Sequence, residues 1–265
     1  QTKGVPNNLK GSIFPFEYNN FNQLKDLINK NKIGVICMEV MRNDYPKDNF
    51  LQKVRQIANK NNIVLVFDEC TSGFRKNYGG LHLNFKVNPD IAIFGKALGN
   101  GYAITSIIGK RNIMETAQKS FISSTFWTER IGPAAAIETL NQMKKLKSWK
   151  IIDSNGKYII KNWQKLAKNY GFQIEVKGLP ALCSFVFKSK NNDKYKALIT
   201  QELLKKGFLA SNSVYSSISH KRSIIDNYFE ELDKVFQKIQ NCENGYNINK
   251  YLKFKIPLKK FERMN

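Results

Sequence analysis

The chain contains 265 residues, of which 42% are hydrophobic, and this length can bury a sizeable core in one large domain or two smaller ones. No apolar run is long enough to span a membrane and no signal-peptide pattern is present, so we expect a cytoplasmic protein without a membrane partner. The 43 Lys and Arg residues outnumber the 21 Asp and Glu residues and give a formal net charge of +22.

Charge and cysteine content argue against two further classes of protein. A strong basic excess can indicate a nucleic-acid partner. The lysines here are spread over the whole chain together with many asparagines, and no RNA-binding, zinc-finger or helix-turn-helix signature is present, so we expect no nucleic-acid partner. The four cysteines, Cys37, Cys70, Cys183 and Cys242, form no CxxC pair, and we expect neither a metal site nor a disulfide framework.

The first part of the chain alternates between loop, helix and strand patterns. Residues 1–20 carry Gly, Pro and Asn without a helical period and indicate a loop, and residues 21–31 indicate a helix. Residues 33–40 form an apolar run typical of a buried strand, with Glu39 near its end. Residues 50–61 have apolar side chains at helical spacing. They predict the crossover helix of a right-handed βαβ unit.

The stretch 63–101 organises the rest of the chain. Its β-branched apolar run, residues 63–67, ends in Asp68 and Glu69, and a second apolar run, residues 91–94, ends in Gly95 and Lys96. Continuous apolar runs of this length suit strands that are buried on both faces of a parallel sheet. Because ligands bind beyond the carboxyl ends of such strands, we expect Asp68 and Lys96 to point into one crevice.

An acid and a lysine in one crevice match the needs of pyridoxal phosphate. The cofactor requires a lysine for its Schiff base, and an acid against the pyridinium nitrogen keeps the ring an electron sink. In the alternative interpretation, Asp68 caps a turn and Lys96 is one solvated lysine among many. These two residues alone leave both interpretations open.

The sequence segments around Asp68 and Lys96 resemble those of the class III aminotransferases, a branch of the fold-type I pyridoxal phosphate enzymes. Within that class they are most similar to the glutamate-1-semialdehyde 2,1-aminomutase branch. The matching pieces, in order, are Asp68-Glu69, Ser72-Gly73-Phe74-Arg75, Tyr78-Gly79-Gly80, Pro89-Asp90 and Gly95-Lys96. The resemblance implies an α/β fold, with a mostly parallel sheet in a partial large domain and a small α+β C-terminal domain.

The resemblance also implies roles for individual residues. Lys96 is then the catalytic lysine that forms the Schiff base, and Asp68 holds the ring nitrogen. Cys70 stands where the family commonly has a Val under the pyridine ring, and Glu39 stands where it usually has Glu-Pro. Thr125 matches a Thr that reaches the cofactor phosphate of the neighbouring subunit, which implies a homodimer with its active site at the subunit interface.

The loop around Thr125 departs from the family pattern, because TFWTERIGP replaces the commoner TxSGNP. Thr128 is therefore a second candidate for the same role. Arg130 either pairs with a substrate carboxylate or forms a surface or interdomain salt bridge. His220, at the end of a late segment that resembles the family, is expected to satisfy local hydrogen bonds.

Composition and resemblance divide the chain into three parts. We expect a partial cofactor-binding large domain at 1–148, a small C-terminal domain at 149–245 and a polar, Lys-rich tail at 246–265. Helices are predicted near 151–170, 195–206 and 224–240, between strand-like pieces near 172–176 and 181–187. The resemblance begins in the middle of the family's large domain, without its Ser-Gly-Thr phosphate turn. We therefore expect a fragment of a longer protein, lacking the N-terminal part, rather than a truncated gene product.

The function that follows is a pyridoxal phosphate-dependent transaminase, which passes an amino group between a small-molecule amino donor and a carbonyl acceptor. One alternative is the aminomutase reaction, which converts glutamate-1-semialdehyde to 5-aminolevulinate. The divergent TFWTERIGP loop favours the general transaminase over the aminomutase. Another alternative is a catalytically inactive truncated homologue that acts as a dimer partner.

Overall fold

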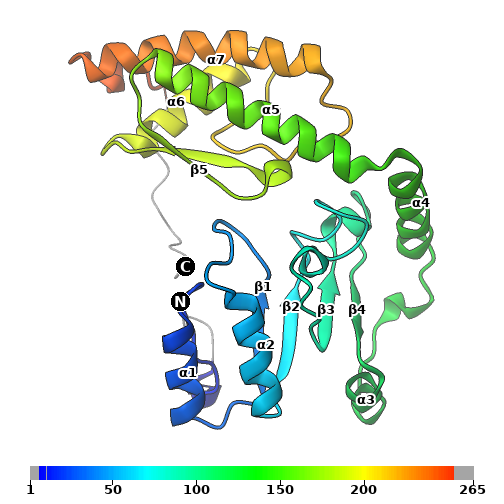
Figure 1. The fold of residues 1–265 in the computed structure, drawn as a ribbon. Helices are drawn as coiled ribbons and strands as arrows, with labels where there is room; N and C mark the ends of the chain where they lie inside the picture. The colour runs from blue at the N-terminus through cyan, green and yellow to red at the C-terminus, as the bar shows by residue number, and fades with distance from the viewer. Residues whose placement is uncertain (1–5, 10, 254–265) are drawn as a thin grey trace.

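The computed structural model describes residues 6–9 and 11–253, and Figure 1 shows their arrangement. Residues 1–5, 10 and 254–265 lie outside the described residues, and they include parts of the predicted N-terminal loop and of the predicted tail. The described residues form a four-stranded sheet of order β1-β2-β3-β4 and a two-stranded sheet of β5 and β6. We call these the larger sheet and the smaller sheet.

The larger sheet is mostly parallel, as predicted. Its strands are β1 (Val35–Glu39), β2 (Val64–Asp68), β3 (Ile91–Phe94) and β4 (Ser106–Gly109). β2 pairs in parallel with β1 and with β3, and β4 closes one edge in the antiparallel direction. Helix α2 (Phe50–Lys60) connects β1 to β2 and confirms the predicted βαβ unit. Helix α1 (Phe21–Lys30) begins at Asn20, whose side chain caps the first turn by accepting a hydrogen bond from Gln23 N.

Helices α1 and α2 cover one face of the larger sheet. The apolar side of α2 places Phe50 and Val54 against β1 and β2. Side chains alternate along a strand, so Leu65 and Phe67 of β2 meet this helix while their neighbours face the other way. This packing makes a buried core whose members lie on consecutive elements of the chain.

The opposite face of the larger sheet is only partly covered. Val35 in β1 is 55% exposed and Ile107 in β4 is 56% exposed. Burial on both faces was predicted for residues 63–67 and 91–94; it holds for Leu65, Val66 and Phe67 of β2 and only in part for β3, whose Ile91 and Ile93 are half-buried. Residues 33–40 were predicted as a buried strand, and β1 is buried on one face only. The reason is that α1 and α2 pack on one face, and no described element covers the edges of the other.

The smaller sheet packs under three helices with a core of its own. Its strands are β5 (Ile174–Lys177) and β6 (Ser184–Phe187), and its helices are α5 (Ser148–Asn169), α6 (Asn192–Leu204) and α7 (Arg222–Glu243). These elements confirm the predicted helices and strands of this part. Fully buried aromatic side chains fill the core, and Trp163 Nε1 donates a 2.9 Å hydrogen bond to the hydroxyl of Tyr228. Ile248, in the predicted tail, also packs in this core.

Two connections hold the smaller-sheet part over the carboxyl ends of the larger sheet (Figure 1). The chain passes through α3 (Arg111–Met114) and α4 (Ile131–Leu146) into α5. The short segment Pro180–Leu182 is wedged between the two parts, because Leu179 is buried in the larger-sheet core while α5 crosses Pro180 at Gly156. A Cβ atom at Gly156 would lie 1.8 Å from the carbonyl oxygen of Pro180, so only glycine allows this approach.

Asp90 is a buried carboxylate that connects β2, α2 and the residue after β4. Its Oδ2 accepts hydrogen bonds from Leu65 N at 2.8 Å and from Arg55 Nη1 at 2.9 Å, and its Oδ1 lies 2.7 Å from Lys110 Nζ. Burial alone would raise the pKa of Asp90, but the hydrogen bonds from Leu65, Lys110 and Arg55 outweigh it and hold that pKa below its ordinary value.

Asp90→Asn should lower the free energy of unfolding by about 2 kcal/mol at neutral pH, because charge-assisted hydrogen bonds are lost. The depressed pKa means that the Asp90 contribution is present above the unfolded-state pKa of about 4 and is lost as the pH falls through the folded-state value. Urea unfolding between pH 7 and pH 3 should therefore show a steeper acid loss of stability in the parent than in the variant.

Glu115→Gln is the control, because Glu115 forms only an exposed pair with Arg111 at 3.9 Å. It should change stability by less than about 0.5 kcal/mol. Identical acid profiles for the parent and Asp90→Asn would contradict this account of Asp90.

Candidate active site

The parallel register brings the predicted site residues to one edge of the larger sheet. Glu39 is the register partner of Asp68, and Asp68 is the partner of Ile93 in β3. Lys96 follows the end of β3 by two residues. Because parallel strands end at the same edge, these two carboxylates and this lysine meet beyond the sheet.

Lys96 stands on a strained turn. It opens a short 3₁₀ helix, Lys96–Leu98, with a φ of 44°, which is in the left-handed region that side chains other than glycine rarely adopt. Its Nζ donates a 3.1 Å hydrogen bond to Thr71 Oγ1. Strained residues that the surrounding structure holds in place cluster at functional sites, so the conformation of Lys96 supports a functional role. Within residues 6–9 and 11–253, no carboxylate pairs with this amine.

Asp68 and Cys70 connect the end of β2 to the end of β3. Asp68 Oδ1 accepts a 2.9 Å hydrogen bond from Cys70 N. The Cys70 sulfur packs against Gly95, where an added Cβ would lie 3.3 Å from Sγ. Burial raises the pKa of the Cys70 thiol, and the nearby Asp68 carboxylate raises it further, while the charge of Lys96 opposes both. The thiol therefore lies within electrostatic reach of the acid and the amine together.

Sequence reasoning missed two members of this cluster, Arg42 and Thr71. Arg42 Nη1 donates to Glu39 Oε1 at 3.3 Å and to Thr71 Oγ1 at 3.1 Å. The buried Thr71 hydroxyl thus accepts hydrogen bonds from both Arg42 and Lys96. Arg42 follows the end of β1 by three residues and Thr71 follows the end of β2 by three residues, and a position just beyond a parallel strand was the signal that could have found them.

Glu69 follows Asp68 directly but belongs to the interior of the fold. It is fully buried, its Oε2 accepts a 2.5 Å hydrogen bond from Ser72 Oγ, and its Oε1 lies 2.9 Å from both His82 N and His82 Nδ1. The alternation of side chains sends Asp68 and Glu69 to opposite sides. Glu69 therefore stabilises the turn after β2, while Asp68 points to the opposite side, where it contacts Cys70.

The segment predicted to touch the cofactor phosphate is exposed. Thr125 and Thr128 bound an exposed 3₁₀ helix, and Arg130 is exposed as well. In the part of the chain that the structure describes, no hydrogen bond or ion pair joins any of these three residues to Lys96. Glu129, between them, caps α4 by accepting hydrogen bonds from Ile131 N and Gly132 N.

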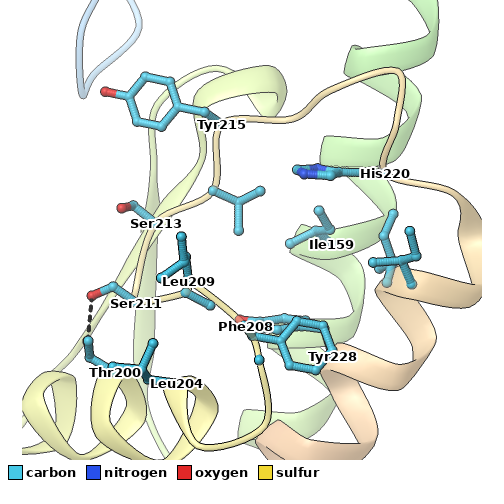
Figure 2. Close-up of a pocket in the computed structure, with 15 residues that line it drawn as sticks. Ile159, Thr200, Leu204, Phe208, Leu209, Ser211, Ser213, Tyr215, His220 and Tyr228 are labelled. Carbon is cyan, nitrogen blue, oxygen red and sulfur yellow. Dashed lines mark hydrogen bonds between the residues drawn. The ribbon is translucent and has the colours of Figure 1, made fainter.

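A separate cavity of about 690 Å³ lies in the smaller-sheet part (Figure 2). Its wall is mainly apolar, with Phe208, Leu209 and Tyr228 gathered on one side and Tyr215 and His220 at the other end. His220 accepts a 3.3 Å hydrogen bond from Ser217 N, the local role expected of it. None of the residues that line the cavity belongs to the cluster at the carboxyl edge of the larger sheet.

Over residues 6–9 and 11–253, no group of three or more His, Cys, Asp or Glu side chains is arranged to hold a metal ion. Over the same residues, no helix is both long enough and apolar enough to cross a membrane.

Comparisons with known proteins identify the family. The family described as aminotransferase class-III matches residues 18–242. The chain is similar to 3-aminobutyryl-CoA aminotransferase of Cloacimonas acidaminovorans, with 33% identity over 207 residues that cover 75% of this chain and 50% of the relative. It is also similar to glutamate-1-semialdehyde 2,1-aminomutase of Methanocaldococcus jannaschii, with 27% identity over 260 residues that cover 89% of this chain and 61% of the relative.

A solved structure shows the same fold. The FumI protein of Sphingopyxis sp. MTA144, determined with PLP, superposes with a TM-score of 0.85 at 18% identity and covers 94% of this chain and 63% of that one. This likeness confirms the predicted fold class, the α/β fold of the fold-type I PLP enzymes. The chain spans 50% to 63% of the length of these three proteins.

Asp68 raises the pKa of the Cys70 thiol and Lys96 lowers it, so removing either charge should change the reactivity of Cys70 in opposite directions. Asp68→Asn should lower the pKa of the Cys70 thiol and speed its alkylation by iodoacetamide at pH 8 several-fold, because a neighbouring negative charge is removed. Lys96→Met should slow the reaction, because a favourable positive charge is removed. Mass spectrometry of the peptide that contains Cys70 gives both rates.

Cys242 supplies the internal control. Burial and the charge of Glu243 raise the pKa of its thiol, so neither substitution should change its alkylation rate. Equal rates for Cys70 in all three proteins, or a change of the same sign in both variants, would show that the three residues do not share one crevice.

Proposed function

Because the chain belongs to the class-III aminotransferase family, we propose that it transfers an amino group from a small-molecule amino donor to a carbonyl acceptor with pyridoxal 5'-phosphate as cofactor. One observation carries this proposal: Asp68 and Lys96 lie on the same edge of a parallel sheet, close enough for both to act on the pKa of Cys70.

The residues at this edge fit the functional groups of the cofactor. Lys96 is exposed, and among the described residues its Nζ has a neutral hydroxyl as its hydrogen-bond partner, so the amine is available for covalent attachment. Asp68 accepts hydrogen bonds from the backbone N and the thiol of Cys70, and a carboxylate has acceptor sites beyond these two for the ring nitrogen. Cys70 Sγ packs against Gly95, next to Lys96, and Glu39 is the register partner of Asp68, so both residues would border the cofactor.

Pyridoxal phosphate, when bound, supplies the electron sink that stabilises negative charge on the donor's α-carbon. The protein's own residues supply positioning and proton transfer. Lys96 Nζ takes the proton from the α-carbon of the donor, and the Thr71 hydroxyl holds this amine within the crevice. The Asp68 carboxylate keeps the ring nitrogen protonated by placing a negative charge against it.

A homodimer is part of the proposal. The segment that carries Thr125 is exposed, and so are its aromatic neighbours Phe121, Phe126 and Trp127, at 99%, 74% and 69%. Exposed aromatic side chains in one short segment are typical of a surface that a partner covers. A second subunit on this surface would bring Thr125 to the phosphate of the neighbouring cofactor, with Thr128 as the other candidate.

The aminomutase reaction is the second candidate, because a glutamate-1-semialdehyde 2,1-aminomutase is among the similar proteins. Both reactions use the same lysine and acid. They differ in whether the amino group leaves for a second molecule or returns to the first.

Incubation with pyridoxal phosphate followed by borohydride reduction should add a pyridoxyl mass to the peptide that contains Lys96. Lys96→Ala should lose this adduct and all turnover, because no other side chain at the edge offers an amine. The exposed Lys144 is the control, since surface lysines of this basic chain also react weakly and should do so equally in both proteins. Labelling of Lys96 no greater than that of Lys144 would favour the catalytically inactive dimer partner.

Glutamate-1-semialdehyde supplied alone separates the two reactions. A general transaminase should leave it unconverted until a carbonyl acceptor is added, because it needs a second molecule to complete the exchange. Formation of 5-aminolevulinate without an acceptor, measured colorimetrically, would instead establish the aminomutase.

A further inference from the structure

The guanidinium of Arg75 has no anionic partner among the described residues. Arg75 lies on the loop that follows β2, and its side chain is half-buried. Its Nε is buried without a hydrogen-bond partner, and over residues 6–9 and 11–253 no carboxylate pairs with this side chain. Burial lowers the pKa of Arg75, and the nearby phenol of Tyr215 opposes that effect. Because a guanidinium stays charged at ordinary pH, an unpaired one inside a fold requires an anion.

Two loops contact the same turn of α5 at this place. The first is the loop that carries Arg75, where Lys76 Nζ lies 2.6 Å from Asp153 Oδ1. The second is the loop between α6 and α7, where His220 O accepts a 2.9 Å hydrogen bond from Asn155 Nδ2. Asp153 and Asn155 are two residues apart in α5, so the two loops converge where the larger-sheet part meets the smaller-sheet part.

The same two loops hold buried donors that are not satisfied. Four buried side-chain nitrogen or oxygen atoms of the described residues lack a hydrogen-bond partner, and two of them, Arg75 Nε and Ser216 Oγ, are donors on these loops. Ser216 is only 3% exposed, and its backbone N is fixed by a 2.9 Å hydrogen bond to Ala181 O. Buried polar groups normally have partners, so two such exceptions on converging loops indicate a ligand that accepts hydrogen bonds.

The charges of this cluster do not balance. Arg75, Lys76 and Lys157 are cations, and Asp153 is the one carboxylate of the described residues that pairs with any of them. Burial alone would raise the pKa of Asp153, but hydrogen bonds from Lys76 and Lys157 hold that pKa below its ordinary value, so Asp153 is ionised at neutral pH. Three positive charges against one negative leave an excess of two positive charges. A phosphate group carries about two negative charges near neutral pH.

We propose that Arg75 binds a phosphate group at the junction of the two parts, and that the loop between α6 and α7 contributes a second donor through Ser216. The guanidinium fork matches two phosphate oxygens with parallel hydrogen bonds. Free inorganic phosphate and a phosphorylated small molecule share this chemistry. Because the two loops belong to different parts of the fold, the bound anion holds those parts together. None of these residues is among those assigned to pyridoxal phosphate.

Equilibrium dialysis with radiolabelled inorganic phosphate measures the site directly. At constant ionic strength the parent should bind a single phosphate, and Arg75→Gln should weaken that binding about tenfold or more, the effect of losing hydrogen bonds to a charged group. Arg75→Lys keeps the charge but loses the fork and should fall between the two. Arg111→Gln is the matched control, because Arg111 is 91% exposed, and it should behave as the parent.

Chemical modification of the parent tests the same site without a substitution. Phenylglyoxal modifies guanidinium groups, and mass spectrometry of the peptide that contains Arg75 gives the rate at this residue. Inorganic phosphate should slow the modification of Arg75 and leave that of Arg111 unchanged, whereas acetate at the same ionic strength should slow neither. Glycerol 2-phosphate separates the two sources of phosphate. Stronger protection than that by inorganic phosphate would indicate a phosphorylated metabolite, and no protection by this ester would indicate inorganic phosphate.

Stability without phosphate separates a binding role from a structural one. In phosphate-free buffer Arg75→Gln should unfold at no lower urea concentration than the parent, because it removes a half-buried charge that has no partner. An arginine that the fold itself requires would give a lower urea midpoint.

Three outcomes would overturn the proposal. Equal phosphate binding by the parent, Arg75→Gln and Arg111→Gln would assign the binding to the general basic surface. Equal protection of Arg75 by acetate and by phosphate would exclude a phosphate site. Protection by pyridoxal phosphate, but not by inorganic phosphate or glycerol 2-phosphate, would assign the anion to the cofactor. If Arg75→Gln fails to fold, the protection measured on the parent still decides.

Discussion

The parallel register of β1, β2 and β3 is the constraint on which the site depends. It places Glu39 beside Asp68 and sets the end of β3, which precedes Lys96, next to them. A slip of one residue would turn Asp68 to the interior and Glu69 to the crevice, because side chains alternate along a strand. Two buried carboxylates act against such a slip, one at each end of the sheet: Asp90 binds Leu65 N, and Glu69 binds His82.

This edge of the larger sheet carries two cations, Arg42 and Lys96, and two carboxylates, Glu39 and Asp68. Among these four described residues, only Arg42 and Glu39 form an ion pair. A salt bridge between Lys96 and Asp68 would have occupied both groups that the proposed chemistry needs. Instead, Lys96 donates a hydrogen bond to the neutral hydroxyl of Thr71, which also binds Arg42. Asp68 in turn is held by the backbone of Cys70. The acid and the amine therefore stay separate and available, which is what a cofactor with a basic nitrogen and an aldehyde requires.

The sequence was most informative where function depends on the ends of strands. The apolar runs that stop at Asp68 and before Lys96 predicted their shared edge, and helical spacing predicted α1, α2 and the three helices over the smaller sheet. The strand at 33–40 was predicted to be buried, and β1 is buried on one face only, because apolar composition does not show which face a helix covers. Arg42 and Thr71 were not predicted, because the hydrogen bond between them depends on the directions of side chains on two different loops. The role of Thr125 stays a prediction, since no contact within this chain decides it.

The meeting of α5 with the short segment at Pro180 has a consequence for how such a site can change. The two parts meet where the helix backbone at Gly156 approaches the carbonyl of Pro180, with Leu179 buried in the larger-sheet core. Main-chain atoms, which substitutions cannot resize, thus set how closely α5 approaches this segment. Side chains on either side can therefore change through evolution while the way the two parts meet stays the same.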